Sequence, residues 1–167
     1  MADPFVHLHV ASGYSRQYGA SHPHVLAERA AEQEMDTLAL TDRDGTYGAV
    51  RFVKAAMAAR IRPILGVDLA FSGTPMVEEA RGTRAVSKPS TTRSTRTPTR
   101  GGASRDPRLP RVTFLASGKE GWAAVCRLVS ATHQAGERGT PVCTPELVAE
   151  HAAGHQVRVL LGPASEL

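Results

Sequence analysis

The sequence predicts an α/β fold in which parallel strands are joined by crossover helices. From residue 5 to residue 71, short apolar runs alternate with segments whose apolar residues recur at helical spacing. The connections between them are short, which favours neighbouring parallel strands. The apolar runs are nearly continuous, as expected for strands that are buried on both faces.

Residues 1–74 are expected to contain a β-α-β-α-β unit. Residues 5–10 (FVHLHV) are rich in side chains that favour strands, so they are predicted to form the first one. Ser21 followed by Pro23 is typical of a helix start, because proline suits the first helical turn. A helix is therefore predicted over 23–34.

The rest of this unit follows the same alternation. Residues 37–41 (TLALT) are predicted to form the second strand, and residues 42–46 (DRDGT) a turn. Apolar residues at helical spacing, Phe52 among them, predict a helix over 48–60. Residues 62–71 (RPILGVDLAF) are predicted to form the third strand.

Ordered structure is expected again over residues 111–167. Residues 112–116 (VTFLA) read as a strand, and the S-x-x-E pattern of Ser117 and Glu120 predicts a capping box at the start of a helix. Gly136 is a suitable end for that helix. Thr144 and Pro145 then predict a short helix that runs to about His151, and residues 157–161 (VRVLL) a fifth strand.

Residues 75–110 interrupt the alternation. They are rich in Ser, Thr, Arg, Pro and Gly, so the apolar surface they could bury would not offset their loss of conformational entropy. We expect a disordered insert that forms a solvated loop. The alternative is a segment that neutralises nucleic-acid phosphates, but it has no aromatic residue on which bases could stack.

The net charge of the chain is concentrated near this insert. The total is +4, whereas residues 81–111 alone hold eight Arg and one Lys against one Asp, which leaves −4 for the remainder. A generally basic fold surface, of the kind that binds nucleic acid, is therefore not indicated.

Composition and motifs exclude several classes of protein. No apolar run reaches the roughly 18 residues of a membrane span, and the N-terminus does not resemble a secretory signal. Cys126 and Cys143 form no C-x-x-C pair, so we expect reduced thiols and a cytoplasmic protein. Phosphate-binding loops, dinucleotide-binding glycine turns and nucleophile elbows are missing from the sequence.

Polar side chains that could bind metal occur near the ends of the first three predicted strands. His7 and His9 are two residues apart, so alternation along a strand places both on one face. Asp42 and Asp44 follow the second strand, and Asp68 lies late in the apolar third strand, where an unpaired carboxylate would be costly. This pattern suits a zinc or manganese hydrolase site.

Structural roles explain the same residues equally well. The aspartates after the second strand could cap a turn, and Asp68 could belong to a salt bridge. Five other histidines have positions that indicate no metal-binding role, namely His22, His24, His133, His151 and His155.

Longer motifs carry a family resemblance. They read HLHVxSxYS (7–15), GASHP (19–23), LALTDRDGTYGAVRF (38–52), RPILGVDL (62–69) and VTFLA (112–116). In this order they resemble the N-terminal PHP (polymerase and histidinol phosphatase) domain of bacterial DNA polymerase III α subunits, most closely the error-prone type. The resemblance implies a distorted seven-stranded β/α barrel, which this chain would leave incomplete because it has about five strands.

The resemblance also implies a metal cluster that hydrolyses phosphoesters. The first metal-binding motif of the family corresponds to His7 and His9, which are intact, and a later Glu corresponds to Asp68, which is still a carboxylate. A family Asp in the loop after the first motif corresponds to Tyr18. With Asp42, these residues make His7, His9, Asp42 and Asp68 the candidate metal ligands.

Arginines stand where the family has two further histidine ligands. Arg43 replaces the histidine of the TDH motif, and Arg111 the one that opens the VTFLA segment. Arginine stays protonated and has no lone pair for a metal, and its charge repels a cation. We therefore expect Arg43 and Arg111 to pair with Asp42 and Asp68 in a degenerate site with little or no metal.

The function that the resemblance implies is that of a scaffold domain in a polymerase for DNA replication and translesion synthesis. No catalytic residue is assigned, because the polymerase active site lies outside this chain. The expected partners are the polymerase core domains in cis, and DNA through the whole protein. The alternatives are an active zinc- or manganese-dependent phosphoesterase or 3′–5′ exonuclease, a stand-alone protein of the histidinol-phosphatase type, and a gene remnant without function.

Overall fold

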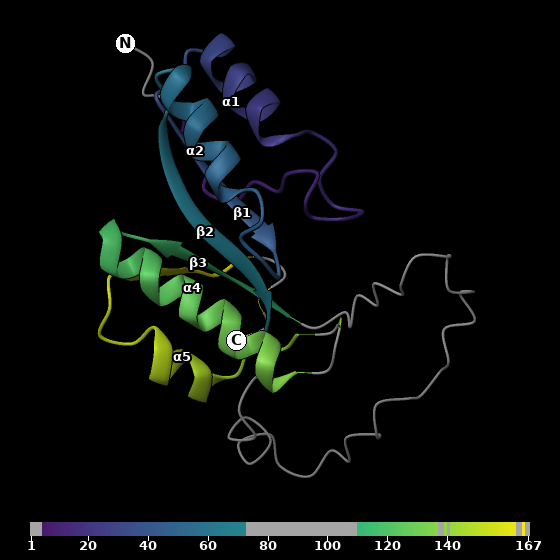
Figure 1. Ribbon diagram of the computed structural model, residues 1–167, viewed down its shortest axis with the longest axis vertical. Helices are drawn as coiled ribbons and strands as arrows, with labels where there is room; N and C mark the ends of the chain where they lie inside the picture. Colours follow the sequence, from purple (N-terminus) through teal and green to yellow (C-terminus); the bar gives the residue numbers. More distant parts are fainter. Residues whose placement is uncertain (1–4, 73–109, 137–138, 140, 163–164, 166–167) are drawn as a thin grey trace, which may run out of the picture.

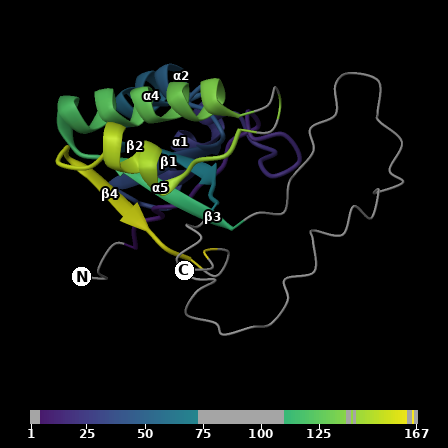
Figure 2. The same ribbon diagram turned by 90° about the horizontal axis from the view of Figure 1, so that it is seen from below.

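The computed structural model describes residues 5–72, 110–136, 139, 141–162 and 165. The described strands form one open four-stranded sheet in the order β1-β2-β3-β4 (Figure 1). Helices α2 and α4 lie on the same face of this sheet, as the second view makes clear (Figure 2). The architecture confirms the predicted α/β class.

The first half of the fold follows the predicted order of elements. It consists of α1 (Pro23–Glu32), β1 (Thr37–Arg43), α2 (Ala49–Ala58) and β2 (Arg62–Ala70). Strands β1 and β2 pair in parallel, so that Arg43 lies opposite Asp68 and Asp42 opposite Val67. This register decides which of the candidate residues can meet.

The second half consists of β3 (Arg111–Ala116), α4 (Gly118–Ala135), α5 (Pro145–His151) and β4 (Val157–Leu160). Here the predicted direction of the strands is wrong, because β3 is antiparallel to β2 and β4 is antiparallel to β3. The parallel arrangement holds only for β1 and β2 and for the bridge between His7 and Leu38.

The connections explain these directions. The chain enters β3 beside the end of β2, where the amide of Phe71 donates to the carbonyl of Pro110 (2.8 Å). After β3, helices α4 and α5 bring the chain back to the C-terminal end of β3, where β4 begins. There the amide of Ser117 donates to the carbonyl of Gln156 (2.8 Å). A strand that starts at the end where the preceding strand stopped runs antiparallel to it, whereas a parallel strand needs a crossover to the opposite end.

Residues 5–10 follow β1 without forming a full strand. The amides of Ala39 and Thr41 donate to the carbonyls of His7 (3.0 Å) and Val10 (2.8 Å), as a parallel neighbour requires. The amide of Val10, however, donates to the side-chain oxygen of Thr41 (3.0 Å) and not to a backbone carbonyl. The predicted first strand is thus reduced to a single bridge.

Two apolar clusters support the sheet. One packs α1 and α2 on β1 through residues such as Leu38, Leu40 and Phe52. The other packs α4 on β2 and β3 through residues such as Val67 and Phe114. The helix-covered face therefore takes alternate residues of each strand, and the residues between them lie on the opposite face.

Two of the predicted helix starts differ in detail. The N-cap of α1 is His22 and not Ser21, with Pro23 in the first turn as predicted. Ser117 is the N-cap of α4, but its side chain makes no cap hydrogen bond to the helix, so the predicted capping box is not formed; Gly118, the first residue of the helix, has a positive φ of 67°. The predicted start of α5 at Thr144 and Pro145 is confirmed, and the Thr144 side chain accepts from the amide of Leu147 (3.5 Å).

The predicted insert at 75–110 lies outside the described residues except for Pro110. Among the helices that the structure describes, none is long and apolar enough to cross a membrane.

Candidate functional site

Asp42 is fully surrounded by donors from the loop before α1. It is 2% exposed, and its carboxylate accepts from the amide of Ser12 (2.7 Å) and from the hydroxyls of Ser12 (2.9 Å) and Ser15 (2.7 Å). Ser15 in turn accepts from the amide of Arg43 (2.9 Å). These contacts fasten the loop to the end of β1, and they satisfy a buried charge that would otherwise be costly.

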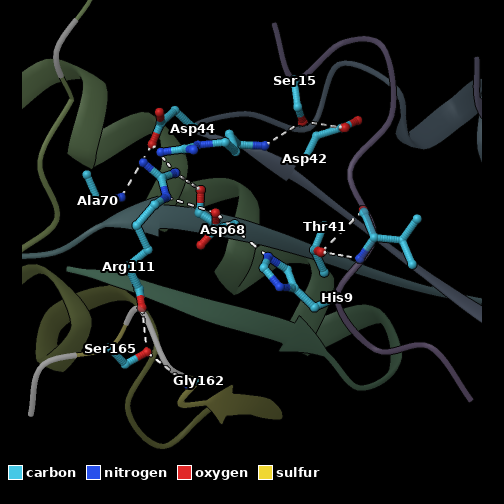
Figure 3. A network of polar contacts seen from close by, with 12 residues as sticks. His9, Ser15, Thr41, Asp42, Asp44, Asp68, Ala70, Arg111, Gly162 and Ser165 are labelled. Carbon is cyan, nitrogen blue, oxygen red and sulfur yellow. Dashed lines mark hydrogen bonds and ion pairs between the residues drawn. The ribbon is translucent and has the colours of Figure 1, made fainter. Parts of the chain in front are cut away.

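The register of the sheet separates Asp42 from Asp68. Asp42 lies opposite Val67, which is in the core beneath α4, whereas Asp68 lies opposite Arg43. Successive residues of a strand point to opposite faces, so the two carboxylates cannot share one site. Figure 3 shows Asp42 directed toward Ser15 and Asp68 directed toward Arg111.

Arg111 is the centre of the polar network on the face that α2 and α4 leave uncovered. Its Nε donates to Oδ2 of Asp68 (2.8 Å), and an Nη donates to Oδ1 of Asp44 (2.9 Å) and to the carbonyl of Asp68 (2.6 Å) (Figure 3). The side chains of Arg111 and Asp68 are only 9% and 6% exposed. The expected pair of Arg111 with Asp68 is confirmed, and Asp44 is an additional partner.

Asp44 is held in place by hydrogen bonds to residues of β2, β3 and α4. Its backbone is in the left-handed region (φ 54°), and its amide donates to the carbonyl of Asp68 (2.9 Å). The ring Nε2 of His133, near the end of α4, donates to the carbonyl of Asp44 (2.5 Å). The turn after β1 is therefore tied to β2 by its backbone, to β3 by Arg111 and to α4 by His133.

The contacts that the structure gives for Asp42 and Arg43 differ from the expected pair of these two residues. Asp42 takes its hydrogen bonds from the two serines, and the guanidinium carbon of Arg43 lies 3.5 Å from the ring centroid of Tyr18. This is the geometry of a cation–π contact. Two residues that replace family ligands, Arg43 and Tyr18, thus contact each other.

The two histidines of the first motif have different surroundings. His9 approaches Asp68, with Nε2 3.8 Å from Oδ2, and its side chain remains 61% exposed. The hydrogen bond to Asp68 raises the pKa of His9 above its ordinary value of 6.5, although burial and the nearby arginines oppose this effect. His7 is exposed, and its ring lies edge-on against Phe5 with centroids 4.7 Å apart.

These contacts test whether the residues present suit the metal cluster that the resemblance implies. The carboxylate of Asp68 and that of Asp44 are bonded to a guanidinium, and that of Asp42 is bonded to three donors. In the part of the chain that the structure describes, no three His, Cys, Asp or Glu side chains are grouped so that they could hold a metal ion. The donor set does not fit such a cluster.

Sequence reasoning missed the residues that organise Asp42. Ser12 and Ser15 are three apart in the loop that follows the first histidine motif, and both are buried. Serines are common in exposed loops, so only their spacing beside a strand that ends in a buried Asp could have indicated this role. The role of His133 is not visible in the sequence, because its partner is a backbone carbonyl, which leaves no trace there.

Comparison with known proteins agrees with the family resemblance of the sequence motifs. The model of the PHP domain family matches residues 7–165. An error-prone DNA polymerase of Mycobacterium bovis is 35% identical over 152 residues, which cover 90% of this chain and 12% of that protein. Error-prone DNA polymerases of Nocardia farcinica and Corynebacterium efficiens are 34% and 35% identical over 91% and 95% of this chain.

The chain spans only 12% to 14% of the length of these three relatives. Among solved structures, an amidohydrolase from Chromobacterium violaceum aligns with 77% of this chain and 33% of its own, at 21% identity and a TM-score of 0.47. That likeness is too low to bear on function.

Proposed function

The chain belongs to the PHP domain family, whose model matches residues 7–165, and we propose that it is the first domain of an error-prone-type DNA polymerase. It matches the N-terminal region of such polymerases over about nine-tenths of its own length. In this proposal the domain is a scaffold that packs in cis against the polymerase core, in the cytoplasm, and DNA synthesis belongs to the whole protein.

The observation that carries the scaffold role is the position of Arg111. Its guanidinium neutralises Asp68 and Asp44 and also bonds the carbonyl of Asp68. A hydrolytic metal site needs carboxylates that are free to donate lone pairs to the ion. An arginine that is 9% exposed and always protonated excludes an ion from this position by both volume and charge.

The polymerase assignment is tested by reading the DNA downstream of codon 167, through any frameshift. We expect coding sequence for the polymerase palm and fingers. A stop followed by no polymerase sequence, at a locus that is transcribed as a separate gene, would contradict the assignment.

The scaffold role is tested separately by metal content and hydrolysis. The full chain is dialysed against zinc and manganese, and bound metal is measured by mass spectrometry. We expect less than one ion per chain, no release of phosphate from phosphomonoesters and no shortening of a 5′-labelled oligonucleotide. Two or more tightly bound ions together with either activity would establish the metallo-phosphoesterase alternative instead.

A further inference from the structure

Three oxygen atoms converge on the guanidinium of Arg111. Two belong to Asp68 in β2, namely Oδ2 at 2.8 Å and the backbone carbonyl oxygen at 2.6 Å, and the third is Oδ1 of Asp44 at 2.9 Å. Figure 3 shows the guanidinium between these two aspartates. Carboxylate and carbonyl oxygens are the donors with which proteins surround small hard cations. The arrangement is therefore an oxygen-lined cation site that a side chain of the same chain fills.

The guanidinium satisfies this site from within the fold. The side chains of Arg111 and Asp68 are only 9% and 6% exposed. Among the residues that the structure describes, no buried side-chain nitrogen or oxygen lacks a hydrogen-bond partner. Arginine is always protonated, so it can occupy such a position permanently.

The same site joins four elements of the fold. Arg111 is the first residue of β3, Asp68 belongs to β2, and Asp44 lies in the turn after β1. The carbonyl of Asp44 also bonds His133 near the end of α4. Structural metal ions stabilise small domains by cross-links of this kind, and removal of the ion then unfolds the domain. Here the cation is covalently part of β3, so the cross-link needs no ion from solution.

We propose that Arg111 is a resident structural cation, whose guanidinium holds β3 to β2 and to the turn after β1 by occupying an ion site. Asp44 is then the second acceptor of this cation. The inference deepens the scaffold role proposed above and rests on that role, but not on the polymerase assignment. Its direct consequence is that R111A empties a site that fits a free guanidinium ion.

The test is chemical rescue of R111A in the full chain, in buffer that contains EDTA. The melting temperature is measured by circular dichroism as guanidinium chloride is added up to about 50 mM, far below the molar concentrations at which this salt unfolds proteins. We expect a saturable rise of roughly 3–6 °C once guanidinium is about tenfold above its dissociation constant. If R111A is unfolded without the ion, the same titration should restore its helical signal at low temperature.

Three comparisons locate the bound ion. Tetramethylammonium has the same charge but no N–H donor, so it should not stabilise R111A. R111A/D44N loses one carboxylate, while asparagine tolerates the left-handed backbone of residue 44 (φ 54°) as aspartate does; it should bind guanidinium at least about tenfold more weakly. The wild type, whose site is filled, and R62A, which lacks an exposed arginine, should not respond.

Each of four results would overturn the proposal. They are the lack of a saturable rescue of R111A, an equal rescue by tetramethylammonium, an equal response of R62A, and an unchanged affinity in R111A/D44N. The EDTA keeps divalent metal out of the assay, so none of these results depends on the metal content of the wild type or on the coding sequence downstream of codon 167. The proposed function and this inference can therefore fail separately.

Discussion

The Nε of Arg111 lies 2.8 Å from Oδ2 of Asp68, and the two side chains meet diagonally across neighbouring antiparallel strands, since Arg111 is opposite Ala70. Both are nearly buried. A third group, the carboxylate of Asp44, reaches the same guanidinium from the turn after β1. One side chain of β3 thus fixes the ends of β1 and β2, at the position where the family resemblance would place a metal-bound histidine.

Replacing Arg111 by methionine should destabilise the fold strongly. The change leaves Asp68 buried without its partner, and breaking a buried ion pair from one side costs about 3–5 kcal/mol. The free energy of unfolding is measured in urea from the fluorescence of Trp122, the single tryptophan of the chain. R62M is the matched control, because Arg62 forms an exposed pair with Asp36 at 3.9 Å, worth less than about 1 kcal/mol.

The double variant R111M/D68L distinguishes pairing from packing. It removes both charges, and apolar replacements of a buried ion pair are often neutral. We expect R111M/D68L to be more stable than R111M alone. A double variant that loses as much stability as the sum of the two single variants would show that the pair is not coupled.

Ser15→Ala should loosen the loop before α1. It deletes a hydrogen bond to the buried Asp42 (2.7 Å) and the acceptor of the Arg43 amide (2.9 Å). Hydrogen bonds to charged groups contribute about 1.5–3 kcal/mol, so a loss in that range is expected in urea unfolding. Ser130→Ala is the control, because Ser130 is exposed and bonds only within α4. Equal stability of the two variants would contradict the role assigned to Ser15.

Gly121→Ala should destabilise the chain although alanine is the better helix former. A Cβ at this position would overlap the backbone carbonyl of Gln156, which cannot rotate away as a side chain could. Overpacking costs about 1–3 kcal/mol, against about 1 kcal/mol gained in helix propensity, so the net loss should be up to about 2 kcal/mol. Gly162→Ala, where no atom lies within 4 Å of the added Cβ, should change little. A more stable Gly121→Ala variant would contradict this packing.

The local structure was predictable where a side-chain pattern reports it directly. The β1-α2-β2 unit follows from apolar periodicity. The cost of a buried charge predicts that Asp68 has a partner, and the family resemblance pointed to Arg111 as that partner. Strand direction was not predictable in the second half. The composition of β3 and β4 is the same whichever way they run, and their direction depends on where α4 and α5 return the chain.

The arrangement of the four candidate metal ligands was not predictable from the sequence, for a geometric reason. The ends of neighbouring strands lie close together, but successive residues at each end point to opposite faces of the sheet. Asp42 and Asp68 differ by one position in the register of β1 and β2, and that single step separates them. The sequence also could not indicate that Ser12 and Ser15 satisfy Asp42 and leave Arg43 to stack on Tyr18.

His9 should make the stability of the chain depend on pH near neutrality. Its pKa is raised in the folded state above 6.5, chiefly by the hydrogen bond to Asp68, so the folded protein binds the proton more tightly than the unfolded one. The stabilisation is therefore fully present below pH 6.5 and is lost as the pH rises through the folded-state pKa.

The measurement is the melting temperature of the wild type and of His9→Asn from pH 5 to pH 9. The wild type should be the more stable at the acidic end, and the two curves should converge above the folded-state pKa of His9. The effect should be small, because the His9 side chain is 61% exposed and 3.8 Å from Asp68. His24→Asn, an exposed histidine on α1, is the control. A difference between wild type and His9→Asn that grows toward alkaline pH would mean that Arg111 alone neutralises Asp68, and that His9 opposes that pair instead of supporting it.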